Sequence, residues 1–133
     1  MTMFFQDRYG LHDTQITKIC VVDDWIDLEF GKGIYNLDPK NKEIDLTNGC
    51  HIFIQISDPD IEKCVEIVEI DKGRLHSIGL AELQQMMVRS AFEVEFDFYS
   101  NFNNAMMLIG YIASRKVVFT IYESIDFKIS FSE

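Results

Sequence analysis

Three carboxylates lie two residues apart in one segment of the chain, at Glu93, Glu95 and Asp97. In an extended strand, neighbours at this spacing are roughly 7 Å apart and the outer pair is roughly 13 Å apart. Carboxylates at separations of this order carry out acid–base chemistry in glycoside hydrolases. An alternating acidic row is more typical of the solvent face of a strand, and nothing nearby indicates a cleft. We therefore predict no catalytic residue here and expect that the protein is not an enzyme.

Two other segments bring metal-ligating groups close together. Acidic residues alternate over 58–62, as in calcium loops, but Lys63 stands where such a loop needs glycine, and Pro59 stiffens the chain. His12 and Asp13 are adjacent, yet no further ligands accompany them. The glycines also lack the spacing of a phosphate-binding loop. The sequence therefore predicts neither a metal site nor a cofactor.

The chain has three cysteines, Cys20, Cys50 and Cys64. Because their number is odd and no secretory signal precedes them, a disulfide framework is not expected. Cys50 is next to His51, the only hint of an activated thiol. Adjacent residues of a strand point to opposite faces, so we expect buried, reduced thiols instead.

The elements that must position these groups are mostly strands. Val94, Phe96 and Phe98 alternate with the three carboxylates, which predicts a half-buried strand with an apolar inner face and an acidic outer face. The segment 125–131 alternates in the same way, with Ile125 in the apolar phase.

Further strands are predicted over 16–22, 25–30, 34–37, 50–57, 64–70, 105–112 and 117–122. One helix is predicted over 78–89, with Ser77 as its cap and a Leu/Met stripe at helical spacing. The chain is long enough for one domain, 1–133. We predict a mainly β (α+β) fold, an antiparallel β-sandwich or partly open β-barrel of about eight strands with one packed α-helix.

Glu123 interrupts the alternating pattern. It falls in the same phase as Phe119 and Ile121 before it and Phe127 after it. Either the strand breaks or bulges at Glu123, or a paired carboxylate points inward. Since a buried unpaired charge is costly, a break is favoured.

The composition limits the partners. The formal net charge is −10, so nucleic-acid binding is not expected. No apolar run approaches the roughly 20 residues of a membrane helix, and no signal peptide is visible, which predicts a cytoplasmic protein without a membrane partner. A basic protein is the partner that such charge favours.

The residues predicted to bind this partner are Trp25, Asp27, Glu29, Glu93, Glu95 and Asp97. Both groups combine carboxylates with aromatic neighbours, and aromatic anchors are typical of binding hot spots. A homodimer is also predicted, through an edge pairing of the C-terminal strand. The alternative function is a β-barrel that binds a small apolar ligand in a cavity lined by Phe and Met.

The run Leu11–Ile19, the segments 28–30 and 33–35, and the closing segments 105–110 and 125–127 resemble small uncharacterised bacterial proteins. Some small acidic proteins of this kind are immunity proteins of bacterial toxin systems. The resemblance implies a bacterial, cytoplasmic, non-catalytic protein of immunity type. It carries no binding residues over to this chain.

Overall fold

The computed structural model describes residues 8–100 and 102–132, except for the side chain of residue 103. The strands are β1 (Tyr9–Gly10), β2 (Thr14–Ile16), β3 (Lys18–Val22), β4 (Trp25–Phe30), β5 (Tyr35–Leu37), β6 (Glu43–Leu46), β7 (Cys50–Ile56), β8 (Val65–Asp71), β9 (Arg74–Ser77), β10 (Phe92–Ser100), β11 (Ala105–Ile112), β12 (Arg115–Ile121) and β13 (Ser124–Phe131). The helical segments are α1 (Leu80–Met86) and the 3₁₀ turns η2 (Ile61–Cys64) and η3 (Phe102–Asn104).

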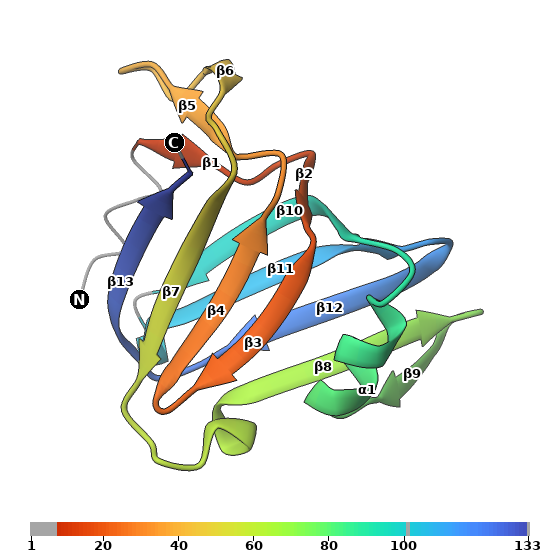
Figure 1. Ribbon diagram of the computed structural model, residues 1–133. Helices are drawn as coiled ribbons and strands as arrows, with labels where there is room; N and C mark the ends of the chain where they lie inside the picture. Colours follow the sequence, from red (N-terminus) through yellow and green to blue (C-terminus); the bar gives the residue numbers. More distant parts are fainter. Residues whose placement is uncertain (1–7, 101, 133) are drawn as a thin grey trace.

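Two antiparallel sheets form the sandwich (Figure 1). One has six strands in the order β2-β10-β11-β12-β8-β9, and the other has four in the order β13-β7-β4-β3. Their facing side chains form one apolar core, with the largest fully buried groups at Phe30, Phe92 and Phe119. A third sheet, β1-β5-β6, lies at one end. The predicted mainly β sandwich is confirmed, and the sheets do not close into a barrel.

The short strands β1, β2, β6 and β9 were not predicted. Every residue of β6 and β9 is exposed, so neither strand contributes to the core, although Ile44 and Leu46 alternate with acidic residues in β6. They are held by backbone pairing, β6 to β5 and β9 to β8, and Asn36 Nδ2 on β5 also donates to Asp45 Oδ1 on β6 at 3.0 Å.

The chain crosses between the two large sheets at two short corners and again through the segment 57–64. Thr17 joins β2 in the six-stranded sheet to β3 in the four-stranded sheet. Tyr122 and Glu123 join β12 to β13, and Glu123 is exposed with a φ of 61°. The predicted strand break at Glu123 is therefore confirmed, because the left-handed backbone there turns the chain into the other sheet.

A β-bulge overturns the expected faces of β10. The register with β11 shifts between Val94 and Phe96, leaving Glu95 without a partner. Val94 is buried, but Phe96 and Phe98 are 48% and 52% exposed. The prediction that all three face the core was wrong for the two phenylalanines, since one extra residue exchanges the two faces of a strand.

A second irregularity shifts β13 in the same way. Its register with β7 changes between Ser124 and Asp126, and Ile125 is 46% exposed. Phe127 remains buried, as predicted.

The predicted helix is shorter than expected. It begins after Gly79, which offers no side-chain cap, and Ser77 belongs to β9 instead of capping the helix. Leu80, Leu83 and Met87 are buried, so the predicted apolar stripe does contact the core.

Gly110 provides the space that the bulged strand needs. A Cβ on Gly110 would lie 1.9 Å from the backbone oxygen of Glu93. We expect Gly110→Ala to lower the free energy of unfolding by about 3 kcal/mol, measured by urea denaturation, because backbone must move. Gly79→Ala is the control, since a Cβ there meets nothing within 4 Å, and it should cost about 1 kcal/mol or less. Equal losses in the two variants would contradict this account.

Candidate functional site

The outer face of the four-stranded sheet collects one of the two predicted groups. Trp25, Asp27 and Glu29 point outward from β4, because Ile26, Leu28 and Phe30 between them are buried in the core. Across the sheet, β4 pairs with β7 and β7 pairs with β13. We call this surface the β4 face. It consists of Trp25, Asp27 and Glu29 with His51, Phe53, Gln55 and Lys128.

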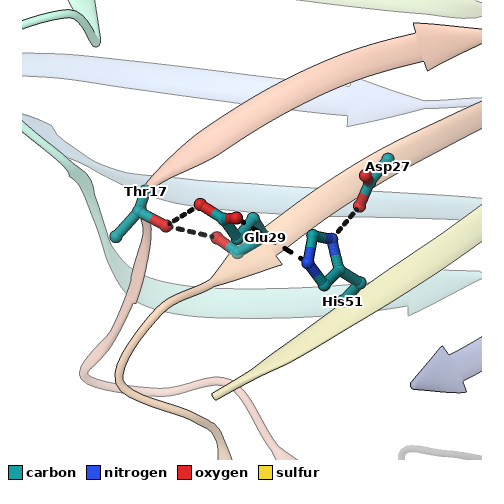
Figure 2. Close-up of polar contacts among 4 residues, drawn as sticks. All are labelled: Thr17, Asp27, Glu29 and His51. Carbon is teal, nitrogen blue, oxygen red and sulfur yellow. Dashed lines mark hydrogen bonds and ion pairs between the residues drawn. The ribbon is translucent and has the colours of Figure 1, made fainter. Parts of the chain in front are cut away.

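A polar network holds the two carboxylates of the β4 face in place (Figure 2). His51 lies between them, with Nδ1 donating to Asp27 Oδ1 at 2.8 Å and Nε2 3.7 Å from Glu29 Oε1. Thr17 Oγ1 donates to Glu29 Oε2 at 2.8 Å. The Asp27 side chain is 19% exposed and that of Glu29 37%, so both remain accessible. The corner residue Thr17 thus also orients a surface carboxylate.

The aromatic groups of the face lie beside cationic or polar neighbours. The Lys128 ammonium is 4.8 Å from the centroid of the Trp25 ring. The rings of His51 and Phe53 are stacked, 5.7 Å apart with 10° between their planes. At the edge of the face, Gln55 Nε2 donates to Asp24 Oδ2 at 2.9 Å. The face can therefore hold a cation over an aromatic ring or between carboxylates.

The second predicted group does not form one surface. Glu93 is exposed on the outer side of β10, whereas Glu95 lies in the bulge and is partly buried. Asp97 lies beyond the bulge, so it is on the side of β10 opposite to Glu93. It accepts a hydrogen bond from Tyr99 Oη at 2.7 Å. The prediction that Glu93, Glu95 and Asp97 share one outer face of β10 was therefore wrong.

Asp97 instead belongs to an open hollow of about 720 Å³ between β10 and the three-stranded sheet, lined by Tyr9, Gly10, His12, Leu37, Asn41, Lys42, Glu43, Asp97 and Tyr99. His12 Nδ1 donates to the backbone oxygen of Glu95 at the bulge. This hydrogen bond, followed by nearby carboxylates, raises the pKa of His12 above its usual 6.5. Burial raises the pKa of Tyr99 well above 10.0, and Asp97 adds to this effect. Sequence reasoning missed this hollow, because tertiary pairing alone brings β1, β5 and β10 together.

The cysteines are structural. Cys50 and Cys64 are buried and Cys20 is partly exposed, all as free thiols. Desolvation raises the pKa of Cys50 to about 11, with a hydrogen bond to Thr47 opposing it. The neighbouring His51 points to the other face of β7 and contacts Asp27 instead. Cys50 is therefore a protonated core residue.

Among residues 8–100 and 102–132, no three His, Cys, Asp or Glu side chains gather in a way that could hold a metal ion. At the acidic segment 58–62, the Asp58 side chain accepts a hydrogen bond from the backbone of Asp60 ahead of η2. No helix in the described part of the chain has the length and apolar character needed to cross a membrane.

Comparisons with protein-family models, with curated proteins and with solved structures found no match to this chain.

His12 makes the stability of the bulge depend on pH. Because its pKa is raised in the folded state, its stabilising effect is present below about pH 6 and disappears as the pH rises through the folded-state pKa. We expect His12→Asn to lower the free energy of unfolding more at acid pH than near neutral or alkaline pH, measured by urea denaturation at both. An equal loss at both values would contradict the bond to the Glu95 carbonyl.

Cys50 should resist alkylation. In the native protein near neutral pH, we expect iodoacetamide to label Cys20 well before Cys50, because the Cys50 thiol is buried and protonated. Peptide mass spectrometry measures both sites, and labelling in urea is the control that makes both reactive. Equal labelling rates in the native protein would contradict this assignment.

Proposed function

We propose that this protein is a non-catalytic interaction module that binds a basic protein partner through the β4 face. The observation that carries the proposal is the position of the face's own cationic and imidazole groups. Lys128 lies over Trp25, and His51 lies between Asp27 and Glu29. An arginine of a partner has the chemistry to occupy either position.

Two further properties support this function. The network of Thr17, Asp27, Glu29 and His51 holds the carboxylates in one geometry before binding, which reduces the entropy lost on association. The formal net charge of −10 attracts a basic partner from a distance and repels nucleic acid.

The narrower proposal is an immunity-type protein of a bacterial cytoplasm that neutralises a toxin by binding it. Its support is the acidic composition and the resemblance of the segments described above. A toxin gene beside the gene for this chain would favour it, and direct binding of that gene product at the β4 face is the decisive observation.

The alternative, a barrel around an apolar ligand, has less support. The sheets do not close into a barrel, and their facing side chains fill the interior. The hollow of about 720 Å³ beside β10 lies outside the core and opens to the surface.

Trp25 is the only tryptophan, so its fluorescence reports directly on the β4 face. We expect a short arginine-rich peptide to change this fluorescence and to bind more weakly as salt rises. Asp27→Asn should weaken binding about fivefold, the upper range for an exposed ion pair. Lys128→Ala should strengthen binding, because it frees the Trp25 ring for the peptide.

Glu62→Gln is the matched control, since it removes an equal charge from an exposed residue of η2 that is not part of the β4 face. Its affinity should stay at the wild-type value. If Glu62→Gln weakens binding as much as Asp27→Asn, the peptide responds only to net charge and the proposed site is wrong. An acidic peptide of equal length should leave the fluorescence unchanged.

A further inference from the structure

An apolar row crosses four strands on the outer face of the six-stranded sheet. The bulge turns Phe96 outward, and cross-strand pairing continues its row through Ile109, Val118 and Val68. Phe98 lies beside this row at 52% exposure, and Leu75 at the far edge is 70% exposed. We call this surface the β11 face.

The central strand β11 is apolar on its outer side as well as in the core. The β11 segment is apolar in both phases, with Met106 and Leu108 in the core and Ile109 on the outer face. Strands that are apolar on both faces are typical of sheets covered on both sides. Such a surface on a folded chain marks an interaction site.

The charges on the β11 face are self-complementary. Lys116 lies at one end of β12, and Glu66 lies on the adjacent strand β8, opposite Thr120 at the other end. Lys116 and Thr120 are four positions apart on β12, a distance of roughly 13 Å along the strand. Lys116 therefore cannot reach Glu66 within one copy. A two-fold axis that crosses the strands at the Val118–Val68 row brings Lys116 of each copy to Glu66 of the other.

The extent of the face suits a reversible dimer. The strands β10, β11, β12, β8 and β9 span roughly 24 Å, and their outer-face rows, polar positions included, extend roughly 20 Å along them. Each copy therefore offers a footprint of roughly 500 Å². Two such footprints reach the lower limit of about 1,000 Å² expected for a specific interface. Glu93 pairs with Tyr111 at a corner of this footprint and is exposed in the single chain.

We propose that two copies of this chain pack β11 face to β11 face as a symmetric dimer. This interface differs from the edge pairing predicted from sequence. β13 is indeed an edge strand, but its register is irregular at Ser124–Asp126, which limits pairing along that edge. The dimer leaves the β4 face on the opposite side of each sandwich free for a basic partner.

The test measures molar mass by sedimentation at micromolar to submillimolar concentrations of the full chain. We expect the mass to rise toward twice 15.5 kDa for the wild-type protein. Lys116→Glu and Glu66→Lys should each weaken dimerisation about tenfold, because each reversal breaks two symmetry-related pairs. The double variant should restore wild-type association, which a merely misfolded variant cannot do.

Val118→Lys should abolish the dimer while circular dichroism remains that of the wild type, because its side chain points away from the core. Val22→Lys is the control, since Val22 is 59% exposed on the other sheet, and it should leave the dimer intact. A wild-type protein that stays monomeric overturns the proposal. So does a dimer that persists in Val118→Lys or whose charge reversals do not compensate. Arginine-peptide binding, read from Trp25, is independent of these outcomes.

Discussion

One residue of β10, Glu95, has no partner on β11, and the faces of the six-stranded sheet depend on it. Before the bulge, Phe92 and Val94 enter the core; beyond it, Phe96 and Phe98 face outward. Gly110 makes the bulge possible, because any side chain there would collide with the Glu93 carbonyl. The segment before β2 closes over the same point, where His12 donates to the backbone oxygen of Glu95. The bulge thus exposes aromatic rings that an unbroken strand would have buried.

The two large sheets consequently present different outer faces. The β4 face is polar, with carboxylates held by Thr17 and His51 around a single tryptophan. The β11 face is apolar, with its central row formed by Phe96, Ile109 and Val118. A sandwich with two unlike faces has the geometry to bind a charged partner on one side and an apolar surface on the other. The two proposed associations therefore do not compete for space.

Most long strands were predictable because their buried and exposed residues alternate. The segment 105–112 was predicted with its observed bounds, and the break at Glu123 followed from its phase. The same reasoning placed Trp25, Asp27 and Glu29 on one strand face, but it could not identify His51 as the group between the carboxylates. That contact joins residues 24 positions apart and depends on the β4–β7 register. The segment 105–112 did indicate an apolar outer face, since the residues on both sides of this strand are mostly apolar.

The sequence by itself determined the fold class, the acidic charge and the apolar stripe of α1, because these follow from composition and local periodicity. Tertiary structure decided which face each residue of β10 occupies beyond Val94. A bulge depends on a close approach between two strands, here at Gly110 and Glu93, and no local pattern records it. The hollow beside His12 and the contacts of His51 with Asp27 and Glu29 are also tertiary features, since both arise only when distant segments meet.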